Sequence, residues 1–239
     1  MSEDLFVKIC GVTSEPDALL AIGMGADAVG FIFAPSPRQV SAVAVADIVK
    51  RLPHGVLTVG VFRDESRQRV VEIANQIGLG AVQLHGHESA EDSRWVRDRV
   101  SLTIKAFSAG DRTISRFEEF GADYLLIDGP SPGSGEVFDW RLGEGVVDPS
   151  RLIVSGGLHP DNVAHAVARL RPFGVDVATG VEAEAGRKDP QLLRAFIANA
   201  RQADRAAQAE HDTEVAPDQA DGGPLVAGDV EEPYDWMDS

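Results

Sequence analysis

The sequence predicts an α/β protein built as a single (βα)8 barrel, followed by a disordered acidic C-terminal tail. Three observations support this fold class. Short β-branched apolar segments alternate with helical segments eight times over roughly the first 200 residues, as in parallel strands joined by crossover helices. Eight such units favour a closed TIM barrel over an open sheet. The chain has 239 residues, 44% of them hydrophobic, which suffices for one barrel with a large core.

The eight predicted strands are apolar along most of their length, which suits strands covered by helices on their outer faces. In chain order they are LFVKIC (5–10), AVGFIF (28–33), VLTVGVF (56–62), AVQLH (81–85), LTIKAF (102–107), YLLID (124–128), RLIVS (151–155) and VDVAT (175–179). The predicted helices cover 14–25, 41–52, 65–78, 89–100, 113–121, 139–145, 160–170 and 189–203. Ser14, Ser41 and Asp189 stand where N-caps are expected, and Pro16 and Pro190 suit a first helical turn.

The charge of the chain is negative and unevenly distributed. The formal net charge is -16; residues 203–239 hold 11 Asp or Glu and one Arg, a net of -10, which leaves -6 for residues 1–202. A nucleic-acid-binding protein would carry a basic stripe, and none is visible, so we expect no nucleic-acid partner. The acidic segment lacks a sustained helical period and is expected to be disordered. We therefore predict a catalytic barrel over 1–202 and a tail over 203–239, whose partner the sequence does not reveal.

Cys10 is the only cysteine in the chain. A single cysteine excludes an internal disulfide and a multi-cysteine metal site, and it fits a reducing compartment. The N-terminal residues MSEDLFVK do not resemble a signal peptide. No apolar run approaches the roughly 20 residues that span a bilayer. We therefore expect a cytoplasmic protein with no membrane partner.

Polar and glycine residues gather at the carboxyl ends of the predicted strands, where the active site of this fold lies. They are Cys10 and Gly11 after the first strand, Arg38 after the second, Gln83 and His85 at the end of the fourth, Asp128 at the end of the sixth, Ser155, Gly156 and Gly157 after the seventh, and Thr179, Gly180 and Glu182 after the eighth. This clustering predicts a functional site at one end of the barrel.

Two glycine-containing loops predict a phosphate site. SGGLHPDNV and ATGVE follow the seventh and eighth strands, the usual phosphate-binding pair of loops in this fold. Glycine lets backbone N–H donors approach phosphate oxygens, and a helix N-terminus adds partial positive charge. The glycines could instead serve only tight turns, but two such loops on adjacent strands favour a small phosphorylated substrate.

Strand alternation places Lys8 and Cys10 on the same inward face of the first strand. Asp176 lies on the eighth strand, which neighbours the first in a closed barrel, so Lys8 and Asp176 are able to pair inside it. Such a pair is either purely structural or also lowers the pKa of Cys10, because a nearby cation favours the thiolate. The second interpretation is a hypothesis for which Lys8→Met is the test.

The motifs VKICGVT, GFIFAPSPRQV, VGVF, VQLHGHE, LLID, GSGEVFDW, SGGLHPDNV and VDVATGVEAEAGRKDP span most of residues 5–200. In this order and spacing they resemble the phosphoribosylanthranilate isomerase family of tryptophan biosynthesis. The resemblance implies a single-barrel isomerase with no metal and no organic cofactor. It implies an Amadori rearrangement of N-(5-phosphoribosyl)anthranilate to 1-(2-carboxyphenylamino)-1-deoxy-D-ribulose 5-phosphate. We also expect a monomer.

The resemblance implies roles for individual residues. Asp128 would be the general acid that protonates the ribose ring oxygen, and Cys10 the general base that takes the proton from sugar C2. Arg38 would contact the anthranilate carboxylate, which its planar fork suits. The remaining implied substrate-binding residues are Gln83, His85, Gly156, Gly157, Thr179 and Gly180. The chain departs from the family pattern at Glu136, where many relatives have Lys or a neutral residue, and at Thr179, where relatives often have a Ser pair.

Alternative functions remain open at this point. The related isomerase of histidine biosynthesis uses two carboxylates, whereas the first strand here offers Cys10. Indole-3-glycerol phosphate synthase would need catalytic lysines and a Glu at strand ends; Lys105 stands within the fifth strand, but the rest of that set is not visible. A zinc site at His85 and His87 lacks a third ligand. A non-catalytic phosphosugar-binding barrel would not need to retain both Cys10 and Asp128. The preference for Arg over Lys fits either a salt-rich cytosol or codon composition.

Overall fold

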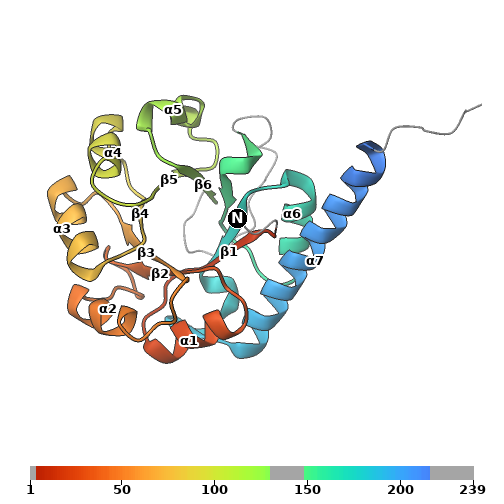
Figure 1. Ribbon diagram of the computed structural model, residues 1–239, viewed down its shortest axis with the longest axis horizontal. Coiled ribbons are helices and arrows are strands. Elements are labelled where there is room, and N and C mark those ends of the chain that lie inside the picture. Colours follow the sequence, from red (N-terminus) through yellow and green to blue (C-terminus); the bar gives the residue numbers. More distant parts are fainter. Residues whose placement is uncertain (1–3, 130–147, 216–239) are drawn as a thin grey trace, which may run out of the picture.

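Eight parallel strands close into a barrel in chain order, with helices around the outside (Figure 1). The computed structural model describes residues 4–129 and 148–215, with side chains up to residue 210. The strands are β1 (Phe6–Ile9), β2 (Ala28–Ile32), β3 (Leu57–Phe62), β4 (Ala81–Leu84), β5 (Thr103–Ser108), β6 (Tyr124–Asp128), β7 (Leu152–Val154) and β8 (Gly174–Val177). The predicted fold class is confirmed, and each predicted strand overlaps one of these eight.

The helices that cover the barrel are α1 (Glu15–Gly23), α2 (Ala42–Val49), α3 (Arg67–Ile77), α4 (Ala90–Arg97), α5 (Phe117–Phe120), α6 (Val163–Leu170) and α7 (Pro190–Val215). Short 3-10 turns are η1 (Arg112–Arg116), η3 (Pro149–Arg151) and η4 (Thr179–Val181), and a small hairpin, β9 (Glu182–Glu184) with β10 (Arg187–Lys188), follows β8. The helix predicted at 139–145 and the departure at Glu136 lie outside the described residues.

The predicted N-caps are present and explain where three helices begin. The Ser14 side chain accepts from the Asp17 N–H at the start of α1, and that of Ser41 accepts from the Ala44 N–H at the start of α2. The Asp189 carboxylate accepts from two backbone N–H groups in the first turn of α7. Each cap satisfies donors that a helix N-terminus otherwise leaves unpaired.

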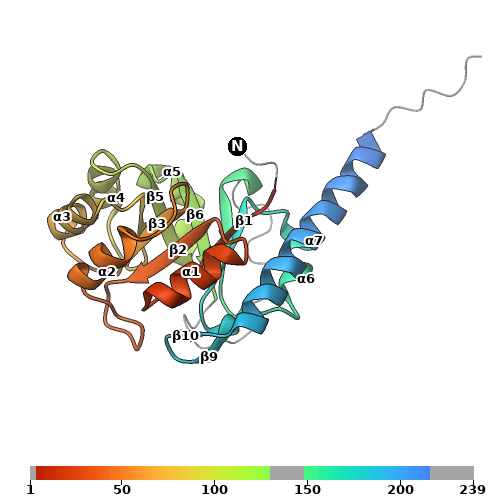
Figure 2. The same ribbon diagram turned by 60° about the horizontal axis from the view of Figure 1, so that its bottom comes forward.

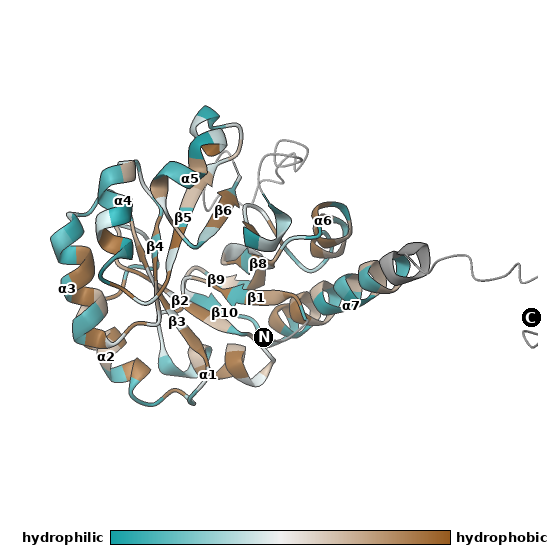
Figure 3. Ribbon diagram, turned by 45° about the horizontal axis from the view of Figure 1, so that its top comes forward, coloured by the Kyte–Doolittle hydropathy of each residue, from teal (hydrophilic) through white to brown (hydrophobic). Residues whose placement is uncertain are grey.

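Apolar side chains form two layers of core. The larger layer lies between strands and helices, and the smaller one fills the barrel interior with Ala28, Val59, Ala81, Ile104, Ala106, Leu126 and Ile153. Figure 3 shows the strands mainly in hydrophobic colours and the outer helices striped with hydrophobic and hydrophilic residues. The side chains of this smaller layer fill the barrel interior below the carboxyl ends of the strands, where the site is predicted.

Helix α7 is longer than predicted, and Figure 2 shows it projecting beyond the barrel. We assigned residues 203–239 to a disordered tail, but the helix continues to Val215. The acidic composition of this segment concealed its helical contacts: Ala207 is buried, and the Asp204 carboxylate accepts from the Leu5 N–H at 2.9 Å. The rest of the predicted tail, 216–239, lies outside the described residues. No helix within the described ranges has the length and apolar character of a membrane span.

Candidate active site

A cavity of about 380 Å³ opens at the carboxyl ends of the strands. Eight predicted site residues line it together: Cys10, Arg38, Gln83, His85, Asp128, Gly156, Gly157 and Thr179. Gly180 is not part of the lining, but a Cβ there would lie 1.9 Å from the Leu158 carbonyl oxygen. Glycine at position 180 therefore allows the loops after β7 and β8 to pack against each other.

Cys10 directly follows β1 and is 6% exposed. Its N–H donates to the Val177 carbonyl on β8 at 2.8 Å, which fixes its backbone at the barrel rim. Its sulfur lies against Gly30 of β2, where a Cβ would come within 2.9 Å of Sγ. Gly30 therefore provides the space that the thiol occupies.

The surroundings of Cys10 raise its pKa, whereas our hypothesis expected them to lower it. Lys8 and Asp176 form the expected ion pair inside the barrel, with Nζ 2.9 Å from Oδ2. Burial raises the pKa of the Cys10 thiol, the Asp176 carboxylate raises it further, and together they outweigh the lowering by Lys8 and Lys188. The hypothesis has the sign of the Lys8 contribution right, but it overlooked the larger cost of burying a thiolate.

Asp128 ends β6 and is held by two hydrogen-bond donors. Its Oδ1 accepts from the Gly129 N–H at 2.9 Å, and its Oδ2 lies 3.1 Å from His85 Nε2. The Gln83 amide nitrogen lies 2.7 Å from His85 Nδ1. In this orientation of the amide, Nδ1 accepts and Nε2 carries the hydrogen that points at Asp128. Gln83 and His85 therefore orient the carboxyl group of Asp128 from β4.

Arg38 leaves the loop after β2 and meets Glu182 at the edge of the cavity. Its Nε and Nη2 donate to the two Glu182 oxygens at 2.8 and 2.7 Å. Lys188 approaches Glu182 from the other side at 3.0 Å. Burial works to raise the pKa of Glu182, but hydrogen bonds from Arg38 and Lys188 outweigh it and hold the pKa below its usual value. Glu182 is thus a carboxylate between two cations.

The glycine loop after β7 has backbone conformations that other residues rarely adopt. Gly156 and Gly157 have φ values of 83° and 67°, and a Cβ on Gly156 would lie 2.0 Å from the Gly129 nitrogen. Within the described ranges, neither residue donates its backbone N–H to another protein group. These two donors at the cavity are therefore available to an anion such as a phosphate.

Comparison with known proteins identifies the family to which the chain belongs. The family model described as N-(5'-phosphoribosyl)anthranilate (PRA) isomerase matches residues 7–199. The chain belongs to this family.

Two relatives show how far the likeness extends. The N-(5'-phosphoribosyl)anthranilate isomerase of Desulforudis audaxviator is 48% identical over 204 residues, which cover 82% of this chain and 98% of the relative. That of Thermotoga petrophila is 44% identical over 201 residues, with 82% and 98% covered.

Solved structures of the PRA isomerase family share the fold. The phosphoribosyl anthranilate isomerase of Thermus thermophilus aligns with a TM-score of 0.76 at 38% identity, covering 82% of this chain and 98% of that one. A family structure in complex with reduced 1-(O-carboxyphenylamino)-1-deoxyribulose 5-phosphate aligns with a TM-score of 0.74 at 39% identity, covering 83% and 99%. That ligand carries the carboxylate and the phosphate for which the residues above were predicted.

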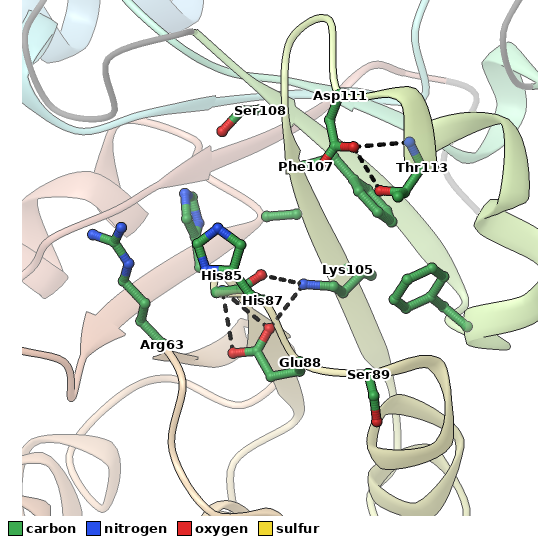
Figure 4. A pocket seen from close by; sticks show the side chains of 13 residues that line it. Arg63, His85, His87, Glu88, Ser89, Lys105, Phe107, Ser108, Asp111 and Thr113 are labelled. Carbon is green, nitrogen blue, oxygen red and sulfur yellow. Dashed lines mark hydrogen bonds and ion pairs between the residues drawn. The ribbon is translucent and has the colours of Figure 1, made fainter.

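A second cavity of about 310 Å³ lies beside the first, and Arg63 and His85 line both. Figure 4 shows that Lys105 points there toward Glu88, with Nζ and the carboxylate 2.8 Å apart. Lys105 also donates to the Gly86 carbonyl at 2.7 Å, so it serves as a buried structural cation and not as the free amine that indole-3-glycerol phosphate synthase would need. Among the described residues, no group of three His, Cys, Asp or Glu is arranged to hold a metal ion.

Lys188 is the site residue that our sequence analysis missed. Its ammonium donates to the Cys10 and Ala178 carbonyls at 2.6 and 3.0 Å, which ties the ends of β1 and β8 together. A signal for it was available, because the chain has only four lysines, and three of them (Lys8, Lys105 and Lys188) are at most 3% exposed. A rare lysine in an arginine-rich chain therefore indicates a position where a compact ammonium is needed.

Proposed function

We propose that this PRA isomerase family member converts N-(5-phosphoribosyl)anthranilate into 1-(2-carboxyphenylamino)-1-deoxy-D-ribulose 5-phosphate, with Asp128 as acid and Cys10 as base. The observation that carries this proposal is the meeting of Cys10, Asp128, Arg38 and the glycine loop in one cavity. A thiol, a carboxyl group, a guanidinium and free backbone N–H donors are the groups that this reaction requires. The wider role in tryptophan biosynthesis follows from that reaction.

The first step opens the sugar ring. Asp128 delivers a proton to the ribose ring oxygen, the C1–O bond breaks, and the nitrogen lone pair forms a C1=N double bond, which leaves the imine protonated on nitrogen. His85 and the Gly129 N–H fix the direction in which the carboxyl group faces. Precise placement matters because a proton is transferred efficiently only within hydrogen-bond distance.

The second step moves the proton from C2. The electron-poor imine acidifies this C–H bond, the Cys10 thiolate removes the proton, and the electron pair forms the enolamine, which tautomerises to the ketone at C2. The thiol is buried and mostly protonated, so the reactive thiolate is a minor species at neutral pH. Closeness of the thiolate to the substrate compensates for its low population.

The two ends of the substrate are held away from the reacting atoms. We assign the phosphate to the N–H groups of Gly156 and Gly157, which have no acceptor among the described residues, and to Thr179 on the adjacent loop, where Gly180 lets the two loops pack together. We assign the anthranilate carboxylate to Arg38, which follows β2 and contacts the hairpin after β8. Binding at both ends fixes the ribosyl carbons between Cys10 and Asp128.

The experiment that tests this function follows the decay of phosphoribosylanthranilate fluorescence with the wild type, Cys10→Ser and Asp128→Asn. We expect each variant to lose at least about a hundredfold in kcat while still binding the product. Full activity in both variants would refute the mechanism. A variant Asp111→Asn is a suitable control, because Asp111 lines only the neighbouring cavity (Figure 4).

The same proposal includes a monomeric, cytoplasmic enzyme. Only three large apolar side chains in the described ranges are exposed, and they lie on three different helices: Leu19, Val43 and Leu192. Such scattered residues do not form the contiguous apolar patch of a permanent interface. Sedimentation equilibrium at micromolar concentration checks the monomer, and a mass twice that of the chain would exclude it.

A further inference from the structure

The Glu182 carboxylate lies buried between Arg38 and Lys188 at the edge of the candidate active site. The side chains of the three residues are 4%, 13% and 0% exposed. Glu182 begins β9 and Lys188 ends β10, and the two are paired across this hairpin. The hairpin therefore presents one carboxylate and one ammonium to an arginine that follows β2, two strands along the barrel from β8.

The guanidinium of Arg38 has two edges that can each bind a carboxylate with two hydrogen bonds. Glu182 occupies the Nε–Nη2 edge. Nη1 makes no hydrogen bond to any residue that the structure describes, and Arg38 lines the cavity. The Nη1–Nη2 edge is therefore open to a second carboxylate.

The aliphatic part of Arg38 is fixed as well. A Cβ on Gly11, the residue after Cys10, would lie 2.6 Å from Arg38 Cδ, so the arginine stem lies directly on this glycine. Arg38 is thus held at its stem by β1 and at one guanidinium edge by the hairpin. Its free edge has a defined direction before any substrate arrives.

Charge balance gives Lys188 a separate role. Arg38 and Glu182 alone would neutralise each other, which would leave little attraction for an incoming anion. Lys188 adds a second cation, so the three groups together keep a net charge of one positive unit. A substrate carboxylate on the open Arg38 edge would neutralise this remaining charge in a largely desolvated place, where charge pairing is strongest.

We propose that Glu182 and Lys188 are a positioning pair that aims the Nη1–Nη2 edge of Arg38 at the substrate carboxylate and keeps that edge effectively cationic. Through Arg38, the pair makes the enzyme selective for phosphoribosyl arylamines that carry a carboxylate over those that do not. This inference rests on the proposed function, specifically on Arg38 as the carboxylate site.

The test compares two substrates, N-(5-phosphoribosyl)anthranilate and N-(5-phosphoribosyl)aniline, which lacks the carboxylate. For Glu182→Gln we expect KM for the anthranilate substrate to rise about tenfold with kcat nearly unchanged, because the amide offers Arg38 one acceptor oxygen in place of two and no longer fixes its direction, a loss that outweighs the added positive charge. The kcat/KM for the aniline substrate should stay the same. Lys188→Met should lower the preference similarly, because Glu182 then neutralises Arg38.

Glu184→Gln is the matched control, since Glu184 lies on the same hairpin and its ion pair with Arg187 is exposed. It should leave both substrates unaffected. Equal losses of Glu182→Gln on both substrates, or no loss on either, would overturn the proposal. Should Glu182→Gln fail to fold, the double variant Glu182→Gln/Lys188→Met removes both buried charges together, and the same loss of preference is expected of it.

Arg38→Lys separates this inference from the proposed function. If Arg38→Lys leaves the preference for the carboxylated substrate intact, the assignment of Arg38 itself fails. If Arg38→Lys abolishes the preference and Glu182→Gln does not, Arg38 binds the carboxylate without help, and the positioning role of Glu182 and Lys188 is refuted.

Discussion

Lys8 and Asp176 face each other inside the barrel, with the ammonium 2.9 Å from a carboxylate oxygen and both side chains buried. They are register partners on β1 and β8. Burial works to lower the pKa of Lys8, but the Asp176 carboxylate outweighs it and, with Cys10, raises that pKa, so the ammonium is stabilised mainly by its coulombic attraction to Asp176. The seam between β1 and β8 that closes the barrel thus contains a buried ion pair.

Replacing Lys8 by Met should destabilise the protein by about 3 kcal/mol, because Asp176 is left as a buried charge without its partner. The free energy of unfolding in urea measures this. Lys50→Met is the control, since Lys50 is 74% exposed and its pair with Asp47 contributes well under about 1 kcal/mol. Equal stability of the Lys8 and Lys50 variants would show that the buried pair contributes nothing.

The Cys10 thiol should make activity rise with pH. Burial raises its pKa, so the thiolate that acts as base accumulates only above the usual range of a thiol, about 8.5. We expect kcat/KM to continue rising past that pH, in parallel with the rate of alkylation by iodoacetamide. An alkylation midpoint at or below that of a free cysteine peptide would contradict this.

The same shift should affect stability with the opposite sign. Above the pKa of an unfolded cysteine, the folded protein retains a proton that the unfolded chain has lost. The free energy of unfolding therefore falls as pH rises through that range, and below it Cys10 contributes no dependence on pH. Urea unfolding of wild type and Cys10→Ala between pH 7 and 10 checks this, because the difference between them should change only in the upper part of the range.

His85→Asn should lower kcat about tenfold and change KM little, since the shorter side chain no longer reaches Asp128 to orient it. Steady-state kinetics measure both constants. His87→Asn is the control from the same loop, where the side chain is 87% exposed. If both variants behave like the wild type, the hydrogen bond between His85 and Asp128 has no part in catalysis.

Gly156→Ala should damage the fold far more than a typical glycine replacement. Its φ of 83° disfavours a side chain, and the new Cβ would lie 2.0 Å from the Gly129 nitrogen, so the loop after β7 must move. We expect the free energy of unfolding to fall by at least about 3 kcal/mol, or the variant to fail to bind inorganic phosphate. Gly55→Ala, with a φ of 96° but open space around it, should cost about 1 kcal/mol.

Asp204→Ala should cost about 1 kcal/mol, because it leaves the Leu5 N–H unpaired at the start of β1. Thermal unfolding measures the change. Glu210→Ala, an exposed position on the same helix, should have no effect. If the two variants have the same melting temperature, the part of α7 beyond residue 203 does not stabilise the barrel.

The sequence predicts the barrel well because each strand is short and apolar, and because three of the helices have clear start signals at Ser14, Ser41 and Asp189. Cys10, Arg38 and Asp128 were predicted at the cavity because the end of a strand fixes which rim a residue occupies. The end of α7 was misjudged, since Asp204 reads as part of an acidic tail until its contact with Leu5 is seen. Composition alone cannot show such a long-range contact.

The pKa shifts in the site were harder to predict than the residues that form it. The pKa of Cys10 depends on a balance between burial and nearby cations, and burial can be judged only once the packing around Gly30 is known. Lys188 was missed because it is far from Cys10 in sequence and reaches it through the β9–β10 hairpin, which the hydrophobic pattern of the sequence does not predict. Burial and nearby cations shift the pKa of Cys10 in opposite directions, so the direction of the net shift can be determined only from coordinates.

The burial of three lysines has a practical consequence. Lys50 carries the only accessible side-chain amine, so a succinimidyl ester dye or an activated resin should react with the side chain of this lysine alone. Lys50 follows the last turn of α2, and helices in this fold run opposite to the strands, so it lies at the end of the barrel away from the cavity. A protein that is attached to a surface through Lys50 would keep its substrate entrance facing the solution. Single-molecule or surface-based measurements would then need no engineered tag.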